Sequence, residues 1–369
     1  MAHGPTDENR QPRVAIIGPV PPYRAGIAYC TMRLAQELGA DVISFKRQFP
    51  RMFYPGSSDV DPTLPRFAGA RFLLDVVHPL TWIRTALLLR REKPQAVILV
   101  WWVWVWALPY LTLLAFLSKR TRVILQCHII GDKEPAAWKR ALTNLVLRRG
   151  DVLVVHAQSE AADARKRTHK PVVTTFLPVH ELGGAIPSRD EARRILGLQG
   201  NVALFFGHVR PFKGLDIALR AWPLLKTEVT LVVAGEAWWK GEAEYRALAE
   251  GLPNVRLDFR FIPDAEIATY FSACDVVLAP YRIEAQSGVA LTAFHFARPV
   301  IASDAGGLPE IVEPEMLFPS EDHTALARRV DEFFARTDRA ERERRAAAAA
   351  RKYSWAEYAT LFRRLVAGE

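Results

Sequence analysis

The sequence NVALFFGHVRPFKG occupies residues 201–214. Its apolar run up to Gly207 predicts a buried strand, and residues 215–225 carry apolar side chains at helical spacing. Arg210 and Lys213 are therefore expected on a loop at the carboxyl end of a strand. In an open parallel sheet this is the edge at which ligands bind. Two cations at that edge suit a diphosphate.

A second pattern of the same type begins at Asp275. Residues 275–280 predict a strand, residues 291–297 a helix and residues 299–302 another strand. Ser287 and Gly288 precede the predicted helix. Because amides at the amino end of a helix bind phosphate without needing a side chain, this pattern also predicts a phosphate-binding edge.

The amino-terminal half opens with a strand over residues 13–18, a loop over 19–26 and a helix over 27–38. The loop lacks the Gly-x-Gly-x-x-Gly spacing of dinucleotide binders, which disfavours an oxidoreductase. Residues 122–128 predict a strand that ends in His128. An isolated histidine is more often a structural residue, but the carboxyl end of a strand favours a functional role. Strand and helix alternate throughout both halves, which predicts an α/β fold with two parallel sheets.

Residues 96–117 are the most apolar run and are about as long as the roughly 20 residues that span a bilayer. Pro109 interrupts this run, and four tryptophans lie within Trp101 to Trp106 instead of at its two ends. We therefore predict a buried strand, a loop and a helix. The alternating tryptophans of this run either join the core or face a sugar or lipid acceptor, and the core is favoured for any single one: Trp102, Trp104 and Trp106.

With 369 residues, the chain is long enough for two domains that each bury a core. We expect a flexible polar tail over residues 1–12, which has no apolar run of the secretory type. The predicted domains cover residues 13–180 and 181–353, and a last helix covers 354–369. Ser354 and Glu357 predict a capping box at the start of that helix.

Composition limits the partners and the compartment. Three widely spaced cysteines argue against a disulfide framework or a zinc site and favour the cytoplasm. The net charge is +9, and residues 119–170 hold twelve Lys or Arg against five Asp or Glu. An anionic membrane surface and ordinary solvated helix faces explain this segment equally well. Nucleic acid is disfavoured as a partner, because no aromatic residues interleave with the basic ones in a recognised binding module.

These motifs resemble the retaining GT-B glycosyltransferases of the large family-four branch, and the resemblance covers nearly the whole chain. In that family an Arg and a Lys three residues apart hold the donor's diphosphate, which matches Arg210 and Lys213. Two Glu residues separated by seven positions follow in the family, whereas here Glu284 is followed by Thr292. The resemblance implies that Glu284 positions the sugar. It also puts the contact with the donor's ribose in doubt, because the second Glu usually makes it.

The same resemblance implies the rest of the site and the architecture. His128 matches a histidine close to the transferred sugar, and only Gly26 matches a Gly-Gly pair, because Ala25 precedes it. The implied architecture is two Rossmann-like domains facing across a cleft, with the last helix crossing back to the first domain. The implied catalytic residues are His128, Glu284, Arg210 and Lys213, and the further donor-binding residues are Gly26, Ser287, Gly288, Val289 and Thr292.

The function implied by the resemblance is a retaining glycosyltransferase of the hexosyltransferase type. It moves a sugar from a UDP- or GDP-type donor to a glycan or lipid-linked acceptor. Because Arg210 and Lys213 supply the cations, no divalent metal and no cofactor are expected. The expected location is the cytoplasm, with peripheral association on the inner face of the membrane.

Two other readings stay open. One is a catalytically silent GT-B protein that acts as a membrane-associated partner, which Thr292 and Ala25 motivate. The other is another GT-B enzyme, such as a nucleotide-sugar epimerase or a phosphorylase. Analysis of the sugar product separates the enzymes from one another.

Overall fold

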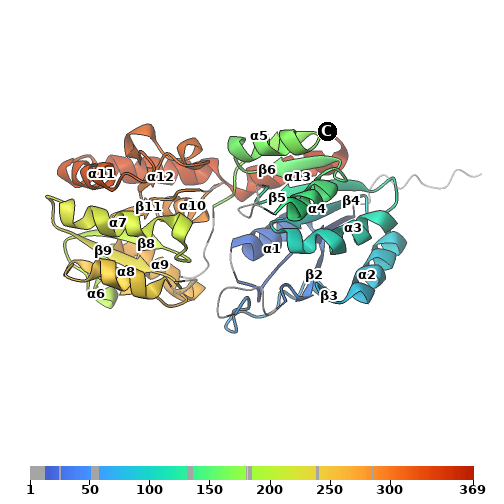
Figure 1. Ribbon diagram of the computed structural model, residues 1–369, viewed down its shortest axis with the longest axis horizontal. Helices are drawn as coiled ribbons and strands as arrows, with labels where there is room; N and C mark the ends of the chain where they lie inside the picture. Colours follow the sequence, from blue (N-terminus) through green and yellow to red (C-terminus); the bar gives the residue numbers. More distant parts are fainter. Residues whose placement is uncertain are drawn as a thin grey trace, which may run out of the picture.

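A computed structural model describes residues 13–24, 26–50, 58–130, 136–179, 181, 185–237, 241–283 and 286–369 of this protein. Figure 1 shows two α/β domains side by side, each built on one sheet. Every strand pair within the two sheets is parallel. The predicted pair of parallel-sheet domains is therefore confirmed.

The first sheet has the strand order β3-β2-β1-β4-β5-β6-β7. Its strands are β1 (Val14–Ile17), β2 (Asp41–Arg47), β3 (Ala70–Asp75), β4 (Ala96–Trp101), β5 (Arg122–Cys127), β6 (Val152–Val155) and β7 (Val172–Thr174). The helices between them are α1 (Gly26–Leu38), α2 (Pro79–Glu92), α3 (Ala107–Phe116), α4 (Ala137–Leu147) and α5 (Gln158–Arg167). The strand order reverses between β1 and β4, so the loops that follow these strands diverge there.

The second sheet has the strand order β10-β9-β8-β11-β12-β13. Its strands are β8 (Asn201–Phe206), β9 (Val229–Ala234), β10 (Val255–Asp258), β11 (Val276–Ala279), β12 (Val300–Ser303) and β13 (Leu317–Phe318). Its helices are α6 (Arg189–Leu196), α7 (Leu215–Ala221), α8 (Glu242–Ala249), α9 (Asp264–Ala273), α10 (Gly288–His295), α11 (His323–Ala335) and α12 (Arg339–Lys352). The order reverses between β8 and β11. Such a switch point is where open α/β sheets bind ligands.

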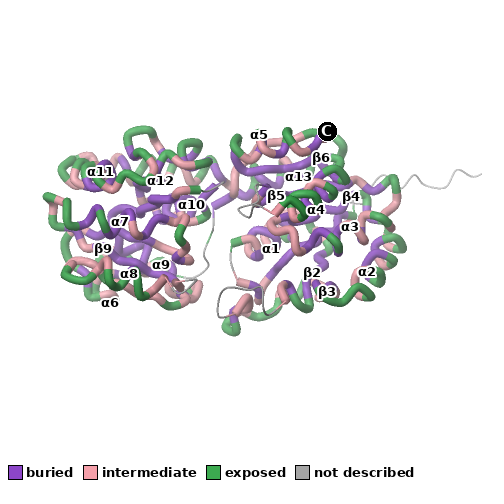
Figure 2. The backbone as a smooth tube through the Cα atoms, in the orientation of Figure 1, coloured by how far each residue is buried: buried purple, intermediate pink, exposed green. Residues whose placement is uncertain are grey.

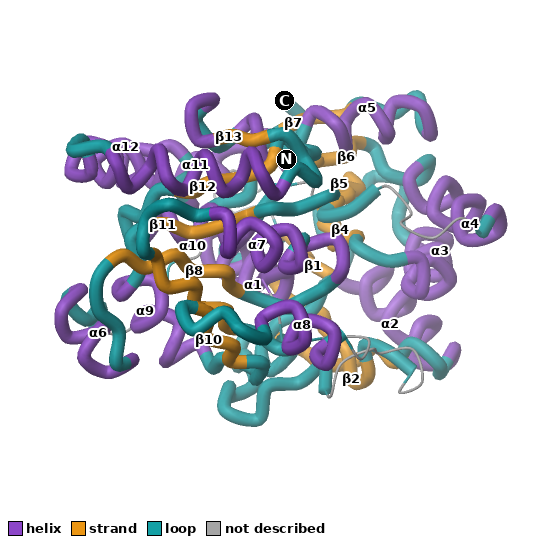
Figure 3. Tube along the Cα trace, turned by 60° about the vertical axis from the view of Figure 1, so that its left-hand side comes forward, coloured by secondary structure: helices purple, strands orange, loops and turns teal. Residues whose placement is uncertain are grey.

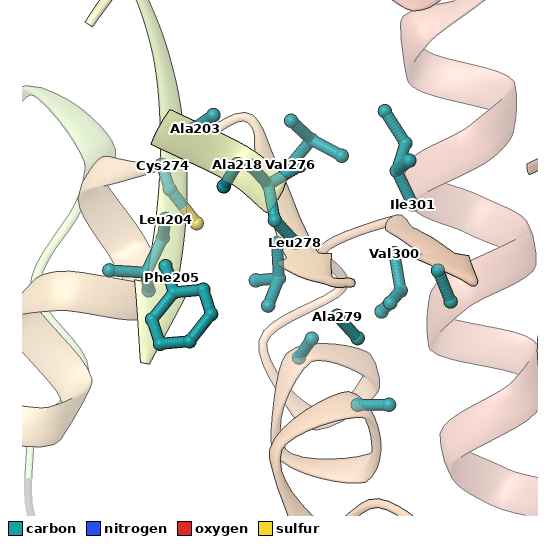
Figure 4. Packing of buried hydrophobic residues seen from close by; sticks show 14 of the residues in the cluster. Ala203, Leu204, Phe205, Ala218, Cys274, Val276, Leu278, Ala279, Val300 and Ile301 are labelled. Atoms are coloured by element: carbon teal, nitrogen blue, oxygen red, sulfur yellow. The ribbon is translucent and has the colours of Figure 1, made fainter. Parts of the chain in front are cut away.

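The cores lie on both faces of the sheets. Figure 2 shows buried strands and outer helices with exposed faces. In the second domain the central strands β8, β11 and β12 fill the core with small and branched side chains, among them Leu204, Val276 and Ile301 (Figure 4). All six residues of β4 are buried, as expected for a strand covered on both faces.

The apolar run 96–117 forms β4, a 3-10 turn over Trp104–Trp106 and α3. Within the described residues, no helix is long and apolar enough to cross a membrane. The predicted strand, loop and helix are thus confirmed. Trp106 is fully buried and stacks on Phe45 with ring centroids 4.0 Å apart, whereas Trp102 and Trp104 are only half-buried.

The last helix, α13 (Trp355–Ala367), packs against the first sheet and α1 (Figure 1). Its buried residues Tyr358 and Phe362 join the core of the first domain, and the indole of Trp355 donates to the carbonyl of Val179 at 3.0 Å. Ser354 caps the helix by accepting from the Glu357 amide, as the capping box predicts. The chain therefore begins and ends in the same domain.

One predicted boundary differs in a way that matters for the site. The helix expected over residues 291–297 spans Gly288–His295. Ser287 caps it by accepting from the Ala290 amide at 3.3 Å, so the helix begins as soon as a capping hydroxyl is available. Apolar periodicity alone placed the start too late, because Gly288 and Val289 add little to that pattern.

Candidate functional site

The loops after β8 and β11 meet at the switch point of the second sheet. The amide of Arg282 donates to the carbonyl of Phe212 at 2.7 Å, which ties the two loops together. Gly214 has φ +68°, and a Cβ at this position would collide with the carbonyl oxygen of Pro280. Only glycine therefore lets the loop over residues 210–214 pack this closely on its neighbour.

Arg282 also braces this loop through its side chain. Its guanidinium donates to both carboxylate oxygens of Asp216 at 2.9 and 2.8 Å and to the carbonyl of Pro211 at 2.6 Å. This hydrogen bonding holds the pKa of Asp216 below its usual value although burial raises it. A planar bidentate pair fixes orientation as well as distance, so Arg282 positions the segment that carries Arg210 and Lys213.

Arg210 and Lys213 form part of a larger group of charges at the ends of β8 and β9. The ammonium of Lys213 lies 3.8 Å from the ring centroid of Tyr281, the residue that follows β11 and Pro280. His208 lies among these charges: its burial, together with the nearby Arg210, lowers its pKa to about 4, and Arg24 and Lys213 act in the same direction. His208 is therefore neutral at neutral pH, and the cations dominate the local field.

Arg24 brings a third cation from the first domain. Its guanidinium lies 3.8 Å from the carboxylate of Glu236 and 4.0 Å from the ring centroid of Phe261, both in the second domain. Arg24 precedes Gly26 by two positions, which places the loop after β1 opposite the loops after β8 and β9. Sequence patterns do not single out Arg24 or Glu236, because their contact joins two domains.

The amino end of α10 completes this edge. Gly288 is exposed, and a Cβ built on it meets no atom within 4 Å. Val289 lies beside the loop after β8, since a Cβ on Gly207 would lie 3.4 Å from its Cγ2. The first amides of an α-helix have no partner inside the helix, so they present hydrogen-bond donors and a positive dipole end at this point.

Thr292 occupies the position of the missing second Glu. It is buried, and its hydroxyl donates to the carbonyl of Gly288 at 2.8 Å within its own helix. The hydroxyl is therefore engaged by the backbone. Glu284 lies outside the described residues, so its predicted position beside the sugar stays a prediction.

His128 stands in a separate group on the first sheet. It follows β5, it is buried with a relative exposure of 9%, and its ring centroid lies 4.9 Å from that of His156. Burial lowers the pKa of His128 to about 4, so the ring is neutral at neutral pH. Its Nε2 has no hydrogen-bond partner among the described residues. The structure thus brings Arg210 and Lys213 together with Arg24, and places His128 with His156 instead.

The predicted absence of a metal stays a prediction. Within the described ranges, no three His, Cys, Asp or Glu side chains come close enough to hold an ion. The sequence does contain an Asp-x-Asp pair, Asp59 and Asp61, in the first domain. Asp61 accepts from the amide and the hydroxyl of Thr63 at 2.8 and 2.6 Å, so one of its oxygens holds a turn.

The part of the sequence that forms this edge is similar to a known protein family. The sequence model of the family Glycosyl transferases group 1 matches residues 200–336, which include Arg210, Lys213 and α10. A D-inositol 3-phosphate glycosyltransferase of Saccharomonospora viridis is 31% identical over 232 residues, which are 57% of this chain and 54% of the relative. One of Mycobacterium leprae is 37% identical over 192 residues, 49% of this chain and 45% of the relative. The chain therefore spans about half the length of these relatives.

Solved structures match over nearly the full length. Sucrose-phosphate synthase of Thermosynechococcus elongatus superposes with a TM-score of 0.74 at 20% identity and covers 98% of this chain and 100% of that one. The HepE protein of Anabaena, solved with UDP and glucose, gives a TM-score of 0.73 at 15% identity and covers 97% of this chain and 100% of that one. These likenesses show the GT-B fold.

Proposed function

From the match of residues 200–336 to the family Glycosyl transferases group 1, we propose that the chain is a retaining glycosyltransferase. Its donor would be a nucleotide-diphosphate sugar of the UDP or GDP type, and its acceptor a glycan or a lipid-linked molecule. The observation that carries this proposal is that the loop with Arg210 and Lys213 lies beside the amino end of α10 at the switch point of the second sheet.

In such a transfer, the negative charge that develops on the departing diphosphate must be stabilised. The bond between the anomeric carbon and the β-phosphate oxygen breaks, the acceptor oxygen bonds to that carbon on the same face, and the acceptor proton passes to the departing phosphate oxygen. Fixed cations and helix amides stabilise negative charge that develops on that oxygen. In this chain those groups are Arg210, Lys213 and the first amides of α10, and no metal is assigned to the step.

His128 is suited to contact with the sugar or the acceptor. Because its pKa is about 4, its ring is neutral and can either donate or accept a hydrogen bond. Its Nε2, without a partner in the described part of the chain, is the atom that would meet a sugar hydroxyl. The proposed role is binding and orientation, since a neutral ring adds no positive charge.

UDP is the first nucleotide to test, because the HepE protein of Anabaena was solved with UDP and with UDP-glucose. We expect the donor's ribose to be held weakly, because the Thr292 hydroxyl already donates to the carbonyl of Gly288. The same observation favours the second candidate function, a catalytically silent partner. A GT-B nucleotide-sugar epimerase is the remaining alternative, and it would return a sugar nucleotide as its product.

The test measures thermal shifts of the protein with UDP, GDP and ADP, followed by product analysis with the matching sugar nucleotide. Ligand at 100 times its dissociation constant adds about 2.7 kcal/mol to the stability of the folded state. We expect one nucleotide to stabilise the wild type and the Lys226→Ala control, but not Lys213→Ala. Lys226 is an exposed lysine of the same domain, away from the loops of the site.

Three results would contradict the proposal. Full transfer by Lys213→Ala would remove the assigned role of this lysine. No shift with any nucleotide would favour the silent partner. An epimerised sugar nucleotide, without transfer, would favour the epimerase.

A further inference from the structure

Three helices cover one face of the first sheet side by side. Helices α2, α3 and α4 lie next to one another in both Figure 1 and Figure 3, and α3 packs against the other two. Each of them precedes one of three neighbouring strands, β4, β5 and β6. Because these strands are parallel, the three helices point the same way. Their amino ends lie at the ligand-binding edge of the sheet and their carboxyl ends at the opposite edge.

The outer faces of these helices, together with Val77 just before α2, carry large apolar side chains that remain exposed in the described structure. Their relative exposures lie between 39 and 56%. We call this set the apolar patch: Val77, Leu80, Ile83, Leu87, Leu108, Trp138 and Leu145. Single exposed apolar residues are normal on a protein surface, but seven of them gathered on adjoining helices indicate an interaction site.

Basic residues follow the apolar patch at the carboxyl end of each helix. Three exposed pairs stand just before β4, β5 and β6, and we call them the basic row: Arg90 and Arg91, Lys119 and Arg120, Arg148 and Arg149. Among the described residues, none of the six forms an ion pair. The three helices contain one acidic residue, Glu92, and its carboxylate already pairs with Arg71 at 2.6 Å.

On α2 the two sets follow one helical spacing. On α2, Leu80, Leu87 and Arg91 are exposed at i, i+7 and i+11. Residues at this spacing lie along one stripe of a helix. On α4, Trp138 and Leu145 are exposed seven positions apart, and the exposed Arg148 and Arg149 follow directly after the helix ends at Leu147. On α3, Leu108 is exposed near the amino end, and the exposed Lys119 and Arg120 lie in the turn after the helix ends at Phe116. Each helix therefore carries exposed apolar side chains that are followed by exposed cations at or just after its carboxyl end.

Cations at the carboxyl end of a helix are by themselves ordinary, because they oppose the negative end of the helix dipole. That explanation accounts for the basic row but not for the exposed apolar side chains that precede it. The combination is what an interfacial surface needs, since Trp and Leu enter the boundary of the acyl chains while Lys and Arg reach anionic headgroups.

We propose that the face formed by α2, α3 and α4 docks on a membrane that contains anionic lipid. A second copy of the chain fits this face less well. A twofold interface uses the same surface on both copies, so it would bring two basic rows together without free acids to compensate them. A bilayer supplies both the apolar layer and the negative charge that the face lacks.

The docked orientation has a consequence for the acceptor, which rests on the proposed function. The apolar patch reaches the amino ends of the three helices, at the same edge of the sheet as His128. A lipid-linked acceptor would then enter from the membrane toward His128, while a nucleotide sugar reaches Arg210 and Lys213 from the aqueous side. Membrane binding itself needs no donor and stands apart from the transfer reaction.

The experiment is co-sedimentation of the full chain with phosphatidylcholine vesicles, with and without phosphatidylglycerol, in the absence of any donor. We expect the wild type to sediment with the anionic vesicles only. The double variants Leu80→Ser/Leu87→Ser and Arg90→Gln/Arg91→Gln should each lower the partition coefficient at least about tenfold, because they remove apolar burial or headgroup attraction. The arginine variant should also respond less to added salt.

Matched controls come from the second domain. Ile195→Ser/Leu224→Ser removes two side chains of similar exposure, 59 and 47%, and Arg351→Gln/Lys352→Gln removes two exposed cations. Both should sediment like the wild type. Bromine-labelled lipid should quench tryptophan fluorescence in the wild type and quench it less in Trp138→Phe.

Two outcomes would overturn the inference. In the first, the wild type stays in the supernatant with anionic vesicles, or the α2 variants sediment as it does. In the second, the wild type forms a concentration-dependent dimer that Leu80→Ser/Leu87→Ser abolishes, which assigns the face to a second copy. The nucleotide shift of each variant is measured separately, so a failure of membrane binding is distinguished from a failure of the proposed donor site.

Discussion

The ring nitrogen Nε2 of His156 lies 2.8 Å from the hydroxyl of Tyr358. This contact joins the end of β6 to the last helix, and Gln126 adds a hydrogen bond of 2.9 Å to the same hydroxyl. His128 packs on the other side of His156. The last helix therefore supplies a polar group to the interior of the first domain, directly behind the histidine that is proposed to meet the sugar.

Removal of the Tyr358 hydroxyl should destabilise the fold. In Tyr358→Phe, the buried groups of Gln126 and His156 lose their common partner, and an unsatisfied buried polar group costs about 1–3 kcal/mol. Urea unfolding measures the loss. Tyr245→Phe is the matched control, because Tyr245 is also buried and its hydroxyl has no hydrogen-bond partner among the described residues. Equal unfolding free energies for the two variants would contradict the prediction.

The unfolding free energy should fall as the solution is acidified. Burial lowers the pKa of His128 and of His208 from 6.5 to about 4, so the unfolded chain binds more protons than the folded one between these values. Stability therefore falls as the pH is lowered through that window, by up to about 1.4 kcal/mol per pH unit for each histidine, and these two groups cause no further loss below it. Urea unfolding at several pH values checks the slope. His208→Gln should make it shallower, and a flat profile would count against both assignments.

Loss of the Arg282 clamp should weaken nucleotide binding more than it weakens the fold. Arg282→Lys keeps the charge but not the paired hydrogen bonds to Asp216 or the bond to Pro211, so the loop with Arg210 and Lys213 gains freedom. We expect a dissociation constant about tenfold higher, which corresponds to about 1.4 kcal/mol. Isothermal titration with the stabilising nucleotide measures it.

The control for this variant is Arg246→Lys. Arg246 donates to Glu242 at 2.9 Å on the exposed surface of α8. Nucleotide affinity should be unchanged there. If Arg282→Lys binds as tightly as the wild type, Arg282 does not position the loop.

Two glycine substitutions should separate folding from binding. Gly214→Ala places a methyl group against Pro280 at φ +68° and should lower stability by about 1 kcal/mol or more. Gly288→Ala has open space around it and should leave the melting temperature unchanged. It should still weaken nucleotide binding, because the methyl group narrows the approach to the first amides of α10. Thermal melts with and without nucleotide compare the two, and an intact melting temperature for Gly214→Ala would refute the close packing.

The parts of the site that the sequence predicted are those carried by short segments. Arg210 and Lys213 follow an apolar run that stops at Gly207, and this pattern is visible within 14 residues. Ser287 and Gly288 were placed before a helix, although the helix begins three residues earlier than its apolar periodicity indicated. Local patterns predict an element well and its boundary less well, because a single capping hydroxyl can start the helix.

Local sequence patterns do not predict the contacts between distant segments. The carboxylate of Glu310 in the second domain accepts from the amide of Gln158, at the amino end of α5 in the first domain, at 2.8 Å. Arg24 and Glu236 meet across the same boundary. No local pattern encodes such a pair, since it depends on how the two domains pack.

The sequence by itself determined the two parallel sheets and the placement of Arg210, Lys213 and His128 at strand ends, because hydrophobic periodicity and glycine act over a few residues. Only the tertiary structure decided which side chains meet: Tyr358 with His156, and Arg282 with Asp216. It also decided which side chains of α2, α3 and α4 face outward. A helix pattern shows that one face is apolar, but the packing of the other elements determines which apolar residues are left exposed.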